Sequence, residues 1–130
     1  MNKDDLISEW ISDLRGGKFK QRYHALADTV GGRCCLGVLC ETYMRLGGEL
    51  SITTDKGCGR VAYNGEKFRL PSEVFLAAGL NNADGTIFSE VPQEPCSLSL
   101  INDYYRWSFT EIADWIQSRP AGLFTVDKWE

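Results

Sequence analysis

The stretch Cys34-Cys35-Leu36-Gly37-Val38-Leu39-Cys40, continued through Leu46, carries the strongest pattern in this sequence. Apolar side chains recur in it at steps of three and four residues, the spacing of one helical face. They form a stripe wide enough to imply burial: Cys35, Leu36, Leu39, Cys40, Tyr43, Met44 and Leu46. Gly47-Gly48 follows, and glycine commonly ends a helix. We therefore predict a buried helix from Cys34 to Leu46, at the centre of the fold.

The cysteines themselves indicate packing more than ligation. The chain has five, an odd number, and none belongs to a Cys-x-x-Cys pair. A disulfide-stabilised secreted domain would show a different arrangement. Zinc sites typically pair ligands about two to four residues apart, a spacing that the distant Cys58 and Cys96 do not continue. We predict reduced, core-packed thiols and no metal or cofactor, with zinc ligation and a reactive thiol as the alternatives.

Three further helices follow from periodicity and end signals. The first runs from Asn2 to Leu14, with Asn2 or Asp4 as its cap and Gly16-Gly17 as its stop. A short helix begins at Pro71-Ser72 and ends before Gly79, because proline suits a first helical turn. Ser108-x-x-Glu111 matches a capping box and predicts a last helix over Phe109–Ser118.

The remaining segments predict turns, loops and a small amount of β-structure. Asn64-Gly65 is a strong hairpin signal, and it separates the β-favouring pieces Arg60–Tyr63 and Lys67–Leu70. Lys18–Leu26 is expected to be a loop or short strand, and the polar Asn81–Pro95 a mobile loop. The prediction is an α+β fold: one small domain over residues 1–130, with three to four helices packed on a short antiparallel β-hairpin or sheet.

Composition narrows the classes of partner. The 130 residues are 43% hydrophobic and 25% charged, as in ordinary globular domains. Fourteen Lys and Arg against 18 Asp and Glu give a formal charge of −4, which argues against wrapping a nucleic acid duplex. The N-terminal residues lack the apolar core of a signal peptide, and no run of about 18 apolar residues occurs. We expect a soluble cytoplasmic protein that binds neither membranes nor nucleic acid.

One basic and aromatic segment is a candidate ligand site. Arg15-Gly16-Gly17-Lys18, with Lys20 and Arg22, combines exposed backbone N–H groups and cations that suit a phosphate or carboxylate. Phe19 and Tyr23 could stack on a base. The order of residues is not that of a P-loop. The alternative is a helix C-cap followed by a solvated basic turn.

A second polar and aromatic cluster precedes the last helix. Asn102-Asp103 is followed by Tyr104-Tyr105 and Trp107, a combination that suits a small polar ligand but also a plain turn. His24 is the only histidine, and Cys34 or Cys35 is a conceivable nucleophile for it. Because the local signatures of cysteine proteases are absent, we expect His24 to pack in a loop or on the surface.

Several motifs form a recognisable set along most of the chain: Trp10…Leu14, Gly17-Lys18-Phe19-Lys20-Gln21, Leu26, Cys34–Cys40, Leu70-Pro71-x-Glu73-Val74, Leu100-Ile101-Asn102-Asp103 and Phe109-x-x-Ile112-Ala113-Asp114. This set resembles a family of small phage and prophage proteins of unassigned activity. The Cys34–Cys40 motif is its most specific part, and Asn81–Pro95 lies outside the resemblance. The resemblance implies a phage accessory protein that acts in the cytoplasm of an infected bacterial host.

The leading functional hypothesis is a non-catalytic binder that antagonises host antiviral immunity by sequestering a nucleotide-like signalling molecule. Cations would hold its phosphates, an aromatic ring would stack on its base and amides would read its edges. The residues expected to line the site are Lys18, Lys20, Gln21, Arg22, Tyr23, Asn102 and Asp103.

Two alternatives come from other classes. One is a protein–protein inhibitor of a host defence or metabolic enzyme, which would use exposed aromatics such as Trp107, Phe124 or Trp129. The other is a small hydrolase or transferase with Cys34, Cys35 or Asp103 as its catalyst. Homo-oligomerisation is compatible with all three hypotheses.

Overall fold

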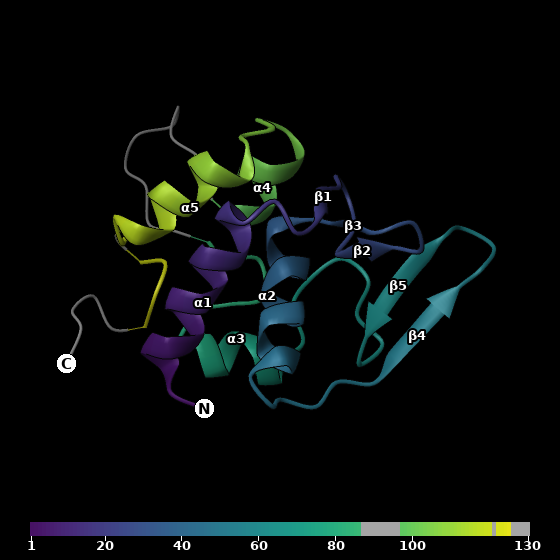
Figure 1. The fold of residues 1–130 in the computed structure, drawn as a ribbon, viewed down its shortest axis with the longest axis horizontal. Coiled ribbons are helices and arrows are strands. Elements are labelled where there is room, and N and C mark those ends of the chain that lie inside the picture. The colour runs from purple at the N-terminus through teal and green to yellow at the C-terminus, as the bar shows by residue number, and fades with distance from the viewer. Residues whose placement is uncertain (87–96, 121, 126–130) are drawn as a thin grey trace.

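A computed structural model describes residues 1–86, 97–120 and 122–125. These residues form an α+β fold of five helices and a five-stranded mixed sheet, which is larger than the expected hairpin. The helices are α1 (Lys3–Arg15), α2 (Cys35–Arg45), α3 (Ser72–Ala78), α4 (Leu98–Asp103) and α5 (Phe109–Gln117). The strands are β1 (Lys20–Gln21), β2 (Ala27–Asp28), β3 (Gly32–Arg33), β4 (Ile52–Asp55) and β5 (Arg60–Tyr63). Figure 1 shows the helices gathered around α2, with β4 and β5 extending away from them.

Helix α2 is the buried centre that its sequence predicts. Cys35, Val38, Leu39 and Cys40 have no exposed surface, and the Cys34 side chain caps the helix by accepting from the backbone N–H of Gly37 at 3.4 Å. The Trp10 indole of α1 donates to the Cys35 carbonyl at 2.9 Å, so the two helices are joined inside the core. Core packing of these three neighbouring cysteines is confirmed.

A buried polar contact also joins α1 to α2. The Asp13 carboxylate, 9% exposed, accepts from the Thr42 hydroxyl at 2.7 Å and from the Arg45 guanidinium at 3.0 and 3.2 Å. A carboxylate so far removed from water requires such partners. This contact fixes the C-terminal half of α1 against α2.

The end signals of the other helices act as their sequence indicates. The Asn2 side chain accepts from the N–H groups of Asp4 and Asp5, and Ser108 with Glu111 forms a complete capping box. Gly79 ends α3 in the left-handed conformation, with φ 71°. Helix α4 was not predicted, because its six residues are too few to show a helical period.

The prediction of a hairpin between Arg60–Tyr63 and Lys67–Leu70 is wrong, because Arg60–Tyr63 pairs with other strands. Strand order is β1-β3-β2-β5-β4, with β1–β3 parallel and the other pairs antiparallel, so β5 pairs with β4 on one side and β2 on the other. Asn64 and Gly65 do form a left-handed turn, but it closes only a single Tyr63–Glu66 bridge. The chain then turns away, and the Lys67 carbonyl accepts from the N–H of Leu26 at 2.8 Å.

The polar segment Asn81–Pro95 is described only in its first part. There the Asn82 side chain accepts from the N–H groups of Asp84 and Thr86, which holds a tight turn. The rest of the expected mobile loop, residues 87–95, lies outside the described residues. Among the helices that the structure describes, none has the length and apolar character needed to cross a membrane.

Candidate functional site

Asn102, at the end of α4, is the polar centre of the candidate site. Its side chain is fully buried, and its Oδ1 accepts from Gln21 Nε2 at 3.0 Å and from the backbone N–H of Cys35 at 3.2 Å. Its Nδ2 donates to the Arg22 carbonyl and to Asp103 Oδ1, both at 2.9 Å. One amide therefore joins α4 to the first residue of α2 and to the segment after β1. Both ends of the amide are occupied by these contacts.

Gln21 extends this network to the segment between α4 and α5. Its Nε2 also donates to the Trp107 carbonyl at 2.8 Å, while the Trp107 ring packs edge-on against Trp115 of α5 with centroids 6.2 Å apart. Trp107, in the segment after α4, is thus held by both β1 and α5. Sequence reasoning placed Gln21 and Asn102 in one site, and the structure does bring them together.

Asp103 connects the same network to His24. Its Oδ1 accepts from the backbone N–H of His24 at 2.9 Å, and its Oδ2 lies 4.0 Å from His24 Nδ1. The His24 side chain is 54% exposed and lies edge-on to Tyr104, with ring centroids 5.4 Å apart. His24 has φ 66°, a strained conformation for a residue with a side chain.

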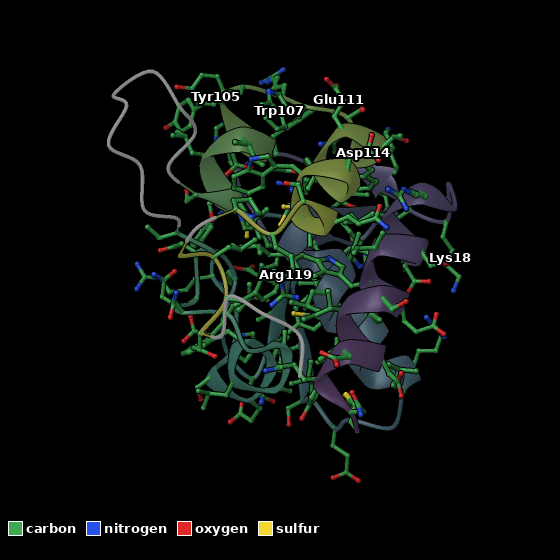
Figure 2. The ribbon with its side chains drawn as sticks, turned by 90° about the vertical axis from the view of Figure 1, so that its left-hand side faces the viewer. Lys18, Tyr105, Trp107, Glu111, Asp114 and Arg119 are labelled. Atoms are coloured by element: carbon green, nitrogen blue, oxygen red, sulfur yellow. The ribbon has the colours of Figure 1, made fainter. Side chains whose placement is uncertain are left out.

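Arg106 contacts Tyr23 and shares the backbone conformation of His24. It also has a positive φ, 55°, and its guanidinium lies 4.4 Å from the centroid of the Tyr23 ring. Tyr104 is 73% exposed and Tyr105 50%. We call Tyr23, His24, Tyr104, Tyr105 and Arg106 the aromatic face. Figure 2 shows Tyr105 and Trp107 at the outer end of the helical region.

The three cations predicted for the site lie in different surroundings. Lys18 lies 3.8 Å from Asp13, and Figure 2 shows it well apart from Tyr105 and Trp107. Lys20 is exposed on β1, next to Gln21. Arg22 donates to Asp28 Oδ2 at 2.9 Å and is only 28% exposed at its side chain. Of these cations, Lys20 has the exposed position nearest in sequence to the network.

Asp28 explains why Arg22 is held inward. Burial alone would raise the pKa of this carboxyl group, but the N–H of Gly32, the Arg22 guanidinium and the N–H of Val30 together hold the pKa below its usual value. Asp28 is therefore a carboxylate at neutral pH, and it neutralises Arg22. The sequence gives no sign of this pairing, since it depends on how the loop after β2 turns.

Two members of the aromatic face, His24 and Arg106, have a backbone conformation that the sequence does not indicate. The positive φ of His24 and of Arg106 is set by the contacts around each residue, and neither residue type by itself predicts it. The opposite error concerns Phe124, which was expected to be exposed. It is 4% exposed and belongs to the core, while Trp107 is half-buried. Trp129 lies outside the described residues.

The buried cysteines beside this network have the properties of packed thiols. Burial raises the pKa of Cys34 to about 12; the N–H of Gly37 opposes this effect, and the charge of Asp103 adds to it. Burial also raises the pKa of Cys35 and of Cys40 well above the usual value. A thiol in this state is a poor nucleophile at neutral pH. Within residues 1–86, 97–120 and 122–125, no three His, Cys, Asp or Glu side chains gather as metal ligands would.

Two hollows lie elsewhere, between α1 and α5. One has a volume of about 470 Å³ and is lined by Ser8, Ile11, Ser12, Arg15, Gly16 and Gln117. The other, of about 320 Å³, shares three of these residues and adds Asp4 and Ile7. None of the lining residues belongs to the aromatic face.

Comparison with known proteins relates this chain to one described family. Neither the curated proteins nor the solved structures contain a significant match. The family model described as a domain of unknown function, DUF8296, matches residues 1–120, which include the described helices, the sheet and the aromatic face. On the strength of that match over nearly its whole length, the chain belongs to the DUF8296 family.

Proposed function

We propose that this protein is a binding protein that docks a protein partner on its aromatic face. The observation that carries the proposal is the exposure of Tyr104 and Tyr105, 73% and 50%, beside segments held by partly buried hydrogen bonds. Large exposed aromatic side chains that gather on one surface commonly mark an interaction site. The proposal follows from the position of these rings beside Arg106.

The composition of the face supports a protein partner. Tyrosine and arginine are enriched among the residues that contribute most to binding at protein interfaces. Arg106 stacks on Tyr23 and His24 packs against Tyr104, so these four side chains rest on neighbours before a partner arrives. Such preorganisation lowers the entropy that binding costs.

The shape of the face supports the same conclusion. Small ligands usually occupy enclosed sites that cover most of their surface. Two hollows among the described residues are formed by α1 and α5, whereas the aromatic face presents its rings outward. A surface of this kind suits a flat macromolecular partner.

The resemblance to small phage and prophage proteins supports a partner from the bacterial host. We therefore infer a host defence or metabolic enzyme as the class of partner, with inhibition as the outcome of docking. Under this proposal the aromatic face contributes recognition, and no group of this chain performs a chemical step.

A nucleotide-like ligand is the second candidate, and one observation favours it. The Arg106 guanidinium lies over the Tyr23 ring, and Lys20 is exposed on the adjoining strand, so cations and π-faces that suit a phosphorylated base occur in one region. In this reading Gln21, Asn102 and Asp103 position the binding residues, because their polar atoms are bonded to one another and to the backbone. Sequestration of a host signal would then replace inhibition of an enzyme.

The test compares the aromatic face with a second arginine–aromatic pair on the surface. Arg60 lies over Phe68, with 5.2 Å from the guanidinium to the ring centroid, and Phe68 is 55% exposed, so this remote pair matches Arg106 and Tyr23. Wild-type protein, the double variant Tyr104→Ala/Arg106→Gly and the control Phe68→Ala would each be used to capture proteins from a bacterial host lysate. Arg106→Gly relieves a positive φ while removing the cation, so this variant is expected to fold.

We expect a partner identified by mass spectrometry to be captured by wild type and by Phe68→Ala, and to be lost from the double variant. Equal capture by all three proteins would reject the aromatic face as the docking surface. Native mass spectrometry of the wild type, with cyclic nucleotides and NAD-derived signals as probes, tests the second candidate. A retained nucleotide whose binding depends on Arg106 would favour sequestration over docking of a protein.

A further inference from the structure

The exposed charge of the aromatic face is positive, although the chain as a whole is acidic. The chain has a formal charge of −4, whereas Arg106 is the charged side chain that this face exposes at neutral pH. His24, with a side chain that is 54% exposed, adds a second positive charge when its ring is protonated. The carboxylate that contacts the face, Asp103, is 20% exposed at its side chain. The face thus presents its cation outward and keeps its carboxylate largely covered.

Arg106 has no counter-charge within the described part of the chain. Its side chain stacks on the Tyr23 ring, and it forms neither an ion pair nor a hydrogen bond with the described residues. Arg15 and Arg22, in contrast, each lie within 2.9 Å of an aspartate oxygen. The N–H groups of the Arg106 guanidinium are therefore available to an acceptor on a partner.

The other exposed polar groups of the face also supply hydrogen-bond donors. The phenolic O–H groups of Tyr104 and Tyr105 can donate, and so can the ring of His24 in either protonation state. Asp103 is an acceptor only, and its Oδ1 is already used by the N–H of His24 and by Asn102 Nδ2. The partner that fits this face best therefore brings acceptors.

The first acid after Arg106 in the sequence, Glu111, is committed to another role. Its Oε1 accepts from the backbone N–H of Ser108 at 3.0 Å, which completes the capping box of α5. Figure 2 shows Trp107 between Tyr105 and Glu111. The capping box thus keeps this carboxylate at the start of α5.

We infer that the aromatic face recognises an acidic protein segment, and that Arg106 binds an Asp or Glu carboxylate of that segment. The inference rests on the proposed docking function and names the chemistry of the partner. A guanidinium binds a carboxylate through two parallel N–H···O bonds, a geometry that a lone ammonium cannot provide. The hydroxyls of Tyr104 and Tyr105 supply donors for neighbouring carboxylates or carbonyls.

The charge of the rest of the molecule directs such a partner to this face. With a formal charge of −4, the chain as a whole repels an acidic segment, and the exposed Arg106 gives the face the opposite sign. Complementary charge of this kind raises the association rate and suppresses wrong orientations. A phosphate offers the same acceptor chemistry as a carboxylate, so nucleotides belong in the test.

A library of random peptides displayed on phage is the probe. It would be selected separately on immobilised wild type, Arg106→Glu and the control Arg69→Glu. Arg69 is also exposed and forms no ion pair with the described residues, so the control makes the same change of charge away from the aromatic face. We expect wild type and Arg69→Glu to select peptides with clustered Asp and Glu, and Arg106→Glu to select Lys and Arg in their place.

Fluorescence anisotropy of a selected peptide then measures what its carboxylates contribute. The same peptide with Asn and Gln in place of Asp and Glu is expected to bind wild type at least about tenfold more weakly. Added salt should weaken the acidic peptide and have little effect on the amide version. Arg106→Gly is a second route if Arg106→Glu fails to fold, because glycine accepts the positive φ while the cation is removed.

The possible failures are distinguishable. Selection of apolar or basic peptides whose binding is lost in Tyr104→Ala would overturn the acidic partner and leave the docking surface in place. A library that yields no peptide dependent on Arg106 would also overturn the inference, and capture from the host lysate then decides the docking surface separately. Binding of a nucleotide that depends on Arg106, without selection of acidic peptides, would overturn it in favour of sequestration.

Discussion

Gly37 of α2 lies so close to Leu26 that a Cβ at Gly37 would be 1.9 Å from the Leu26 carbonyl oxygen. That oxygen is held in place, because it accepts from the backbone N–H of Cys34 at 3.0 Å. The helix therefore packs directly on the backbone that leads into β2, and only glycine allows this approach. The same contact keeps the first turn of α2 next to the segment that carries His24.

Gly37→Ala is expected to destabilise the protein although alanine favours helices. Overpacking against a fixed backbone atom costs about 3 kcal/mol, more than the gain of about 1 kcal/mol that alanine brings to a helix interior. Urea unfolding followed by circular dichroism would measure the loss. Gly57→Ala is the control, because Gly57 is exposed and the atom nearest to its Cβ is a side-chain oxygen of Asp55, 3.3 Å away, rather than a backbone atom. Equal stability of Gly37→Ala and wild type would contradict this account.

Asn102→Leu is expected to lower the free energy of unfolding by about 3 kcal/mol. The substitution leaves Gln21 Nε2, the Cys35 N–H and the Arg22 carbonyl without their buried partner. Chemical denaturation provides the measurement. Asn102→Asp keeps the acceptor but places a buried carboxylate beside Asp103, so its deficit should shrink as the pH is lowered. A deficit independent of pH would argue against close contact of the two side chains.

The described cysteines are expected to react with a thiol reagent in two classes. Cys58 is exposed, whereas Cys34, Cys35 and Cys40 are buried with raised pKa values. Alkylation of the native protein, mapped by peptide mass spectrometry, should label Cys58 first and the other three only as the chain unfolds. Cys58→Ser supplies the control that removes the fast site. Rapid labelling of Cys34 in the native state would instead indicate a reactive thiol.

Asp55 is expected to contribute to the acid sensitivity of the β4–β5 hairpin. A hydrogen bond from the Cys58 thiol, the Lys67 ammonium and the N–H of Gly57 lower the pKa of Asp55 from 3.8 to about 2. Because the folded-state pKa lies below the unfolded value, the stabilisation is present above pH 3.8 and is lost as the pH falls towards 2. Asp55→Asn should therefore flatten the decline in stability across this window. An acid-unfolding curve identical to that of wild type would contradict the assignment.

Local signals were sufficient for the helices that the sequence predicts. The stripe around Leu39, the Asn2 cap and the Ser108–Glu111 capping box depend on residues within one or two helical turns of each other. Such interactions can be recognised from the order of the residues. The bounds predicted for α1, α2, α3 and α5 are accordingly close to the observed bounds. The short α4 is the exception, because too few residues carry its pattern.

Pairing of the strands and assembly of the site depend on contacts between distant residues. Asn64-Gly65 turns the chain as predicted, but β5 pairs with β4, which precedes it. The second partner of β5 is β2, which lies much earlier in the chain. Gln21 and Asn102 are 81 residues apart, and their hydrogen bond exists only because α2 holds both segments at its first turn. The burial of Asn102, the inward pairing of Arg22 and the positive φ of His24 and Arg106 all follow from that packing. Neighbours in sequence carry the information for a helix, whereas these features are set by partners that only the folded chain brings within bonding distance.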